Sequence, residues 1–114
     1  MEITLEKVDN YRGMTYAITH LDFYGAMSWR CGYVAIPDDH PLHGVDYMDI
    51  DEELEVHGGL TYSRESLTVD TNESYTWWLG FDTNHWGDNR ITESLKYVEE
   101  ECKKLIDQIV EEDN

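Results

Sequence analysis

The clearest pattern of hydrophobic and polar positions lies near the C-terminus of the chain. Apolar residues recur there at spacings of three and four in an otherwise charged segment: Leu95, Val98, Cys102, Leu105 and Ile109. Such spacing places these side chains on one face and predicts a single amphipathic helix. Thr92 is expected to cap this helix, because its hydroxyl can accept a hydrogen bond from a backbone N–H of the first turn. About 20 residues would give roughly 30 Å of helix, enough to cross a sheet.

Four other segments have the composition of β-strands: residues 14–19, 33–36, 60–62 and 75–81. They are rich in aromatic, aliphatic and β-branched residues, and glycine, proline or polar residues bound them. Since successive side chains of a strand point to opposite faces, Trp77 and Trp78 should lie on opposite sides of the sheet. Residues 23–29 are ambiguous between a short helix and a wide turn. The expected class is α+β: a small antiparallel or mixed β-sheet with the long C-terminal helix packed on it.

Composition and charge then narrow the class of protein. The 114 residues include 25 acidic and 8 basic side chains, which gives a net charge of −17, and 40% of the residues are hydrophobic. This length and apolar content predict one domain spanning residues 1–114. A field this negative repels the phosphates of nucleic acids and anionic lipids, and it attracts cations or basic protein surfaces. We therefore expect neither direct nucleic-acid binding nor membrane binding.

The cellular location is indicated by features that the sequence lacks. No apolar run of about 18 residues occurs, and the N-terminal segment has neither a basic start nor an apolar stretch, so no transmembrane helix or signal peptide is predicted. Cys31 and Cys102 are the only cysteines, too few for a disulfide-stapled secreted scaffold. The expected location is the cytoplasm.

The negative charge is concentrated in one part of the chain. From Pro37 to Glu55 there are eight acidic residues and no Lys or Arg, together with both prolines and a glycine, so we expect a surface excursion. A solvated acidic surface would have the same composition, but the density of charge favours a contact surface for a basic partner. The candidate partner-binding residues are Asp46, Asp49, Asp51, Glu52 and Glu53.

Histidines beside glycine or proline mark three turns that could form a metal site. Imidazole and carboxylate groups are good zinc ligands, and turns allow ligands from different strands to converge. Asp82 directly follows an aromatic strand and His85 lies three residues later, so both side chains could reach one ion. The predicted zinc ligands are His40, His57, Asp82 and His85, with Cys31 as the alternative to Asp82. Taken singly, each histidine is more often a polar surface residue.

Four strings in the sequence carry a resemblance: RCGYV at residues 30–34, HPL at 40–42, VHGGLTY at 56–62 and GFDTNH at 80–85. In this pattern the chain resembles a family of small phage and prophage proteins and, more narrowly, zinc-containing type II-A anti-CRISPR proteins. The resemblance spans about residues 30–110. Its matching positions are Cys31, His40, His57, Asp82, His85 and Asp88, and it gives no support for His20 or His43 as ligands. Some members have a cysteine where this chain has Thr83, which would alter a site that used that cysteine.

Two functional hypotheses follow. The resemblance implies a non-enzymatic inhibitor that acts in the bacterial host cell, binds a type II CRISPR RNA-guided nuclease, blocks the loading of target DNA and holds a structural zinc ion. The acid excess would suit this nuclease, or another host protein with a basic surface, because acids can compete with DNA for Lys and Arg. The alternative is a small metal-dependent hydrolase with Glu55 or Asp88 as base. Serine-hydrolase, P-loop, Rossmann and zincin motifs are missing from the sequence.

Overall fold

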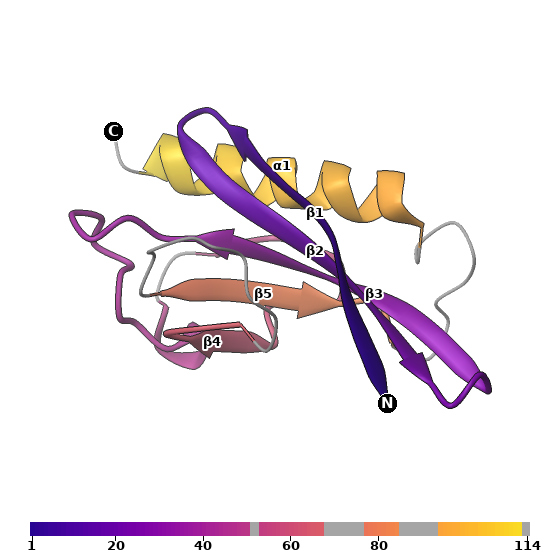
Figure 1. The fold of residues 1–114 in the computed structure, drawn as a ribbon. Helices are drawn as coiled ribbons and strands as arrows, with labels where there is room; N and C mark the ends of the chain where they lie inside the picture. Colours follow the sequence, from indigo (N-terminus) through magenta and orange to yellow (C-terminus); the bar gives the residue numbers. More distant parts are fainter. Residues whose placement is uncertain (51–52, 68–76, 85–93, 113–114) are drawn as a thin grey trace.

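A computed structural model of the chain describes residues 1–50, 53–67, 77–84 and 94–112. These residues form a five-stranded antiparallel sheet with one long helix packed on it, which confirms the predicted α+β class (Figure 1). The strand order is β1-β2-β3-β5-β4. The elements are β1 (Glu2–Tyr11), β2 (Met14–Phe23), β3 (Met27–Ala35), the 3-10 helix η1 (Tyr47–Asp49), β4 (Tyr62–Arg64), β5 (Trp78–Asp82) and α1 (Leu95–Glu112).

The first three strands form a meander of two hairpins. Strand β1 was not predicted, and β2 and β3 are longer than the segments expected at 14–19 and 33–36. Residues 23–29 adopt neither a short helix nor a wide turn, because they form the tight connection between β2 and β3 and the start of β3. In each hairpin turn two successive residues have positive φ: Arg12 and Gly13 at 53° and 85°, Tyr24 and Gly25 at 53° and 74°. This is the backbone signature of the primed turns that match strand twist.

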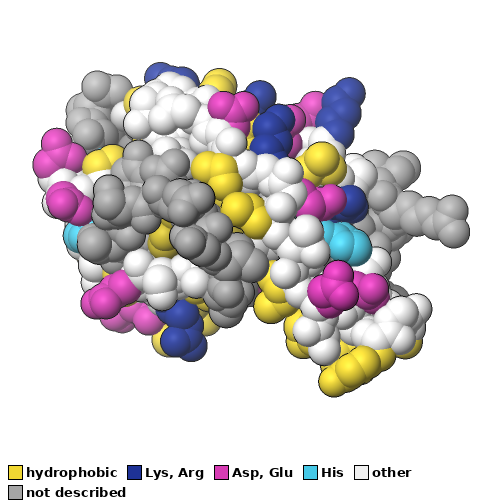
Figure 2. Space-filling model, in the orientation of Figure 1, with side chains coloured by type: hydrophobic (Ala, Val, Ile, Leu, Met, Phe, Trp, Pro, Cys, Tyr) yellow, Lys and Arg dark blue, Asp and Glu magenta, His cyan; other side chains and the backbone are white. Residues whose placement is uncertain are grey.

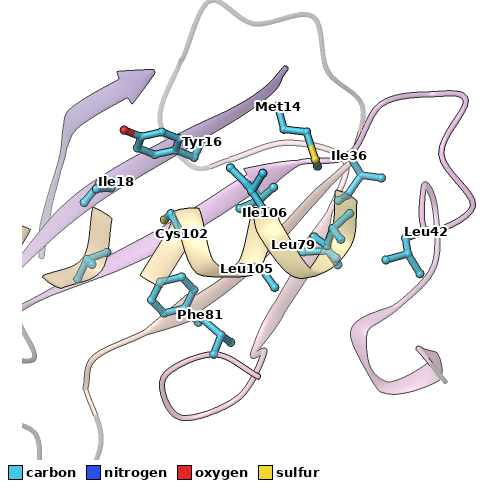
Figure 3. Close-up of a cluster of buried hydrophobic side chains, with 14 residues drawn as sticks. Met14, Tyr16, Ile18, Ile36, Leu42, Leu79, Phe81, Cys102, Leu105 and Ile106 are labelled. Atoms are coloured by element: carbon cyan, nitrogen blue, oxygen red, sulfur yellow. The ribbon is translucent and has the colours of Figure 1, made fainter. Parts of the chain in front are cut away.

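The helix α1 covers one face of the sheet, above β2 and β3. The predicted apolar stripe is confirmed, because Val98, Cys102, Leu105 and Ile109 are fully buried. They pack against side chains of β2, β3 and β5 in the main core (Figure 3). The helix begins at Leu95, and Ser94 accepts a hydrogen bond from the N–H of Tyr97 (3.2 Å), so Ser94 acts as its N-cap. Thr92, the predicted cap, lies outside the described residues.

A second, smaller core lies on the other face of the sheet. It consists of buried Ala17, Cys31, Tyr33, Ala35 and Trp78, with partly buried residues around them. The alternation of strand side chains accounts for the two cores, because neighbours along one strand point to opposite faces. Trp77 packs against the main core and Trp78 belongs to the second core. This confirms the prediction that the two tryptophans lie on opposite faces of the sheet.

Polar contacts also attach the helix to the sheet. Glu99 of α1 forms an ion pair with Lys7 of β1 and accepts a hydrogen bond from the hydroxyl of buried Tyr16 (2.6 Å). About two turns further along the helix, Asp107 accepts hydrogen bonds from the hydroxyl of Tyr11 (3.0 Å) and the guanidinium of Arg12 (2.7 Å). These two helix acids therefore hold α1 over the N-terminal hairpin.

The contacts of Glu99 predict a pH-dependent stability. The hydrogen bond from Lys7, followed by that from Tyr16, lowers the pKa of the Glu99 carboxyl below its ordinary value. A lowered folded-state pKa contributes stability above the unfolded-state value, and this contribution is lost as the pH falls through the folded-state pKa. Tyr16→Phe should lower the free energy of unfolding by about 1 kcal/mol at pH 7. The difference from wild type, measured by urea denaturation, should shrink below about pH 4; a constant difference down to pH 3 would contradict it.

Candidate functional site

Three of the four strings that carry the resemblance meet in one part of the sheet. Cys31 of β3 and Asp82 of β5 are register partners, so they lie directly opposite each other on adjacent strands. Thr61 donates its backbone N–H to Gly80 (2.9 Å) and its hydroxyl to Asp82 Oδ2 (3.2 Å). Cys31, Thr61 and Asp82, one residue from each of these three strings, thus meet around the end of β5, although they are far apart in the sequence.

Asp82 and Cys31 face the side of the sheet that carries the second core. The N–H of Asn84 donates to Asp82 Oδ1 (2.9 Å), so both carboxylate oxygens of Asp82 accept hydrogen bonds from the protein. Burial raises the pKa of the Cys31 thiol to about 11, and the charge of Asp82 acts in the same direction. At neutral pH this thiol is protonated and is a poor nucleophile. Cys31 and Asp82, the two alternative ligands in the predicted zinc site, are thus neighbours on adjacent strands.

Thr83 continues the pairing of β3 and β5 with its side chain. It is fully buried, its hydroxyl donates to the carbonyl of Arg30 (2.9 Å), and it accepts the N–H of the same residue (3.2 Å). Its backbone N–H also donates to that carbonyl (3.1 Å). The hydroxyl of Thr83 thus fixes the backbone after β5. These hydrogen bonds explain why a threonine is buried at this position, and no bound ligand is needed to explain it.

His57 lies in a turn against the helix. Its ring nitrogen Nδ1 is 2.9 Å from the hydroxyl of Tyr97, and the two rings meet edge to face at 5.4 Å. Its backbone N–H donates to Glu101 of α1 (2.8 Å). A hydrogen bond to one ring nitrogen fixes the orientation of an imidazole, as happens for histidines that ligate metals. Tyr97 therefore positions His57, and sequence patterns gave no sign of this tyrosine.

His40 and His43 stabilise the turn that follows β3. The N–H of Leu42 donates to His40 Nδ1 (3.1 Å), so this ring nitrogen acts as an acceptor within the turn. His43 Nδ1 is 2.9 Å from the carbonyl oxygen of Ile36, and its Nε2 lies 3.7 Å from Asp38. Both rings thus have local partners in the turn that leads into the acidic segment.

The predicted zinc ligands are only partly described. His40 forms a hydrogen bond in its own turn, His57 forms hydrogen bonds with α1, and Asp82 forms hydrogen bonds around the end of β5. His85 and Asp88 lie outside the described residues. Within residues 1–50, 53–67, 77–84 and 94–112, no three His, Cys, Asp or Glu side chains are placed to hold one metal ion.

Residues 37–55, here called the acidic segment, are anchored to the protein body at several points. Leu42 is buried in the main core, and the indole N–H of Trp77 donates to the carbonyl of Val45 (3.1 Å). At its end, the N–H of Glu55 donates to Gln108 Oε1 and the side-chain amide of Gln108 donates to the carbonyl of Glu55, both at 2.6 Å. The acidic segment therefore presents its charges from a backbone tied to the core and to α1.

Most described acids of this segment are exposed to solvent: Asp38, Asp39, Asp49, Glu53 and Glu55. Asp46 is half-buried and caps η1 by accepting the N–H of Met48 (3.0 Å). Asp51 and Glu52 lie outside the described residues. In Figure 2, acidic side chains lie at the left of the view, where the acidic segment lies in Figure 1, and others lie at the top and right.

Outside the acidic segment, three basic side chains form ion pairs with acidic residues of the same chain. Lys7 pairs with Glu99, Arg12 with Asp107 and Arg30 with Glu6. These pairs lie on β1, β3, α1 and the first hairpin turn, outside the acidic segment. Part of the charge of α1 is therefore used within the chain, and the acidic segment is the better candidate for an external contact.

Comparison of the chain with protein-family models, curated proteins and solved structures gives no match. Among the described residues, no helix is long and apolar enough to cross a membrane. The candidate sites consequently depend on the geometry of this chain alone. They are the acidic segment and the group of Cys31, Thr61 and Asp82 at the end of β5.

Proposed function

We propose that this chain is a binding protein without catalytic activity, whose acidic segment docks on a basic, nucleic-acid-binding surface of another protein. The observation that carries the proposal is the display of exposed carboxylates on an anchored backbone. Leu42 and Val56 are buried on either side of the exposed Asp49, Glu53 and Glu55. Gln108 of the helix binds the backbone of Glu55. A pre-organised segment loses less conformational entropy on binding than a flexible one, so more of the electrostatic attraction contributes to affinity.

The proposed partner is a type II CRISPR RNA-guided nuclease in a bacterial host cell. Such nucleases hold their nucleic acids in positively charged channels and contact the DNA backbone through Lys and Arg. An array of carboxylates can compete for those side chains, whereas the net charge of −17 opposes binding of the chain to the DNA itself. The resemblance of the four strings to anti-CRISPR proteins supports this choice of partner.

The proposal predicts that the purified protein prevents target DNA from loading onto the guide-bound nuclease, measured by a mobility-shift assay. Inhibition should weaken as salt rises, because the contact is between charges. The double variant Asp49→Asn/Glu53→Gln should raise the half-inhibitory concentration about tenfold, equivalent to losing about 1.4 kcal/mol of binding free energy.

A charge-matched control separates a specific contact from a general effect of charge. Glu100→Gln/Glu111→Gln removes the same two charges from exposed positions of α1. This control should inhibit like wild type. Equal losses for both double variants would show that only net charge matters, and no binding at low salt would remove the proposal.

A structural zinc ion is a separate part of the proposal. His57, oriented by Tyr97, is the described residue best prepared to act as a ligand, and the remaining ligands would include His85. Elemental analysis of the purified protein should find about one zinc per chain, and a chelator should lower its melting temperature. His57→Ala should abolish both zinc content and chelator sensitivity, while Tyr97→Phe should retain zinc. Wild-type protein that contains no zinc and whose melting temperature does not change with a chelator would contradict the zinc proposal. Metal-dependent hydrolysis of a phosphoester would instead favour the alternative function, a small hydrolase.

A further inference from the structure

The β2–β3 hairpin ends in a group of exposed apolar side chains. Tyr24 is 80% exposed, and Phe23, Met27 and the adjacent Met1 are between 41% and 55% exposed. In Figure 1 this hairpin projects away from the helix, and Figure 2 shows hydrophobic side chains at its end. Large apolar side chains grouped on a projecting hairpin are typical of contact surfaces, since isolated exposed apolar residues are common but clusters are not.

The backbone of the hairpin holds Tyr24 in an unfavourable conformation. Its φ is +53°, a region that Gly and Asn adopt far more readily than a bulky residue. The turn is closed by a hydrogen bond from Ala26 N–H to the carbonyl of Phe23 (2.9 Å), and Asp22 Oδ1 accepts the N–H of Gly25 (3.0 Å). The Phe23 ring meets the Tyr24 ring edge to face at 4.9 Å. An aromatic residue is thus kept where the local backbone favours a small one, which points to a role for its ring.

Beside Tyr24 lies a hollow of about 390 Å³, lined by Met1, Glu2, Asp22, Tyr24 and Gly25. Glu2 of β1 and Asp22 of β2 are register partners, so two carboxylates lie directly opposite each other. Like charges in this arrangement destabilise a strand pair. A cation placed between them would remove that repulsion.

We propose that this hollow receives an arginine side chain from a basic partner protein. A planar guanidinium can hydrogen-bond to both carboxylates and stack on the Tyr24 ring, while its aliphatic stem lies against Met1. A lysine ammonium would satisfy one carboxylate at a time and stack less well. The two carboxylates oppose a second copy of this acidic chain or an anionic lipid surface as the occupant.

The inference rests on the proposed function only for the basic character of the partner, because the hollow is a surface separate from the acidic segment. Its test is a titration of the ¹⁵N-labelled protein with the blocked peptide acetyl-Gly-Arg-Gly-amide, followed by NMR. Chemical-shift changes should be concentrated at residues 2 and 22–25. The matching lysine peptide should bind at least threefold more weakly.

Tyr24→Asn provides the decisive variant, since asparagine tolerates positive φ and the hairpin should fold as well as before. It should weaken arginine-peptide binding at least fivefold, and Glu2→Gln should act in the same direction. Met48→Ala, which removes an exposed methionine elsewhere, should have no effect. Shifts spread over all acidic residues, or equal binding by Tyr24→Asn, would overturn the inference.

The two proposals fail in different ways. If Asp49→Asn/Glu53→Gln weakens inhibition of the nuclease about tenfold but leaves the peptide titration unchanged, the acidic segment and the hollow are independent sites. Loss of peptide binding only in Tyr24→Asn, together with normal inhibition, would retain the hollow and assign it to another partner. Absence of peptide binding in wild type would remove the hollow and leave the proposed function standing.

Discussion

Phe81→Ala is expected to lower the free energy of unfolding by about 3–5 kcal/mol, the largest effect of any substitution considered for this chain. Phe81 lies on β5 beneath the helix with 1% of its surface exposed. Its ring and the Cys102 sulfur both border the space above Gly32, where β3 passes under α1. Truncation would leave a cavity at the contact between sheet and helix, because neighbouring side chains relax only partly.

The measurement is urea denaturation followed by tryptophan fluorescence. The chain contains one other phenylalanine, Phe23, which is 41% exposed at the end of a hairpin, and it supplies a matched control. Phe23→Ala should cost clearly less, about 1–2 kcal/mol, because much of its surface already faces water and its truncation leaves no enclosed cavity. Equal losses for the two variants would mean that Phe81 is not part of the packed interface.

Gly32→Ala is expected to destabilise the protein by about 1–3 kcal/mol, through overpacking. A Cβ at this position would lie 2.6 Å from Phe81 Cζ and 2.7 Å from Cys102 Sγ, both closer than van der Waals contact. The helix can approach β3 here because residue 32 has no side chain. Ser28→Ala, at an exposed position of the same strand, should change the stability by less than about 0.5 kcal/mol.

A double-mutant cycle tests the cause. Phe81→Leu removes the ring atoms that a Cβ at residue 32 would meet, so Gly32→Ala should cost less in the Phe81→Leu background than in wild type. Additive losses would show that the strain at Gly32 comes from Cys102 or from the backbone instead. Wild type, the two single variants and the double variant are measured by the same urea denaturation. The coupling energy is the difference between the cost of Gly32→Ala in wild type and its cost in Phe81→Leu.

The elements with strong local patterns could be predicted from the sequence. The helix follows from apolar spacing alone, and the opposite placement of Trp77 and Trp78 follows from strand alternation. Strand β1 could not be recognised in this way, because it is an edge strand of mixed composition whose register shifts between Leu5 and Lys7. A register shift breaks the period of two on which strand recognition depends.

The candidate sites depend more on long-range pairing than on local pattern. The sequence predicts Cys31 and Asp82 as alternative ligands, and only the pairing of β3 with β5 shows that they are neighbours. The acidic character of residues 37–55 was visible in the sequence, but its attachment through Trp77 and Gln108 was not. The turn at Tyr24 also escaped recognition, because nothing local signals that a tyrosine will adopt positive φ.

The paired hydrogen bonds between Gln108 and Glu55 have a thermodynamic consequence. The amide side chain of Gln108 satisfies a backbone N–H and C=O together, as a neighbouring strand would, and it sits near the C-terminal end of α1. A partner that restricts the acidic segment would therefore also restrain the last turns of the helix. Such coupling is reciprocal. Fraying of those turns would therefore reduce the binding free energy of the partner by the same amount that the partner stabilises the turns.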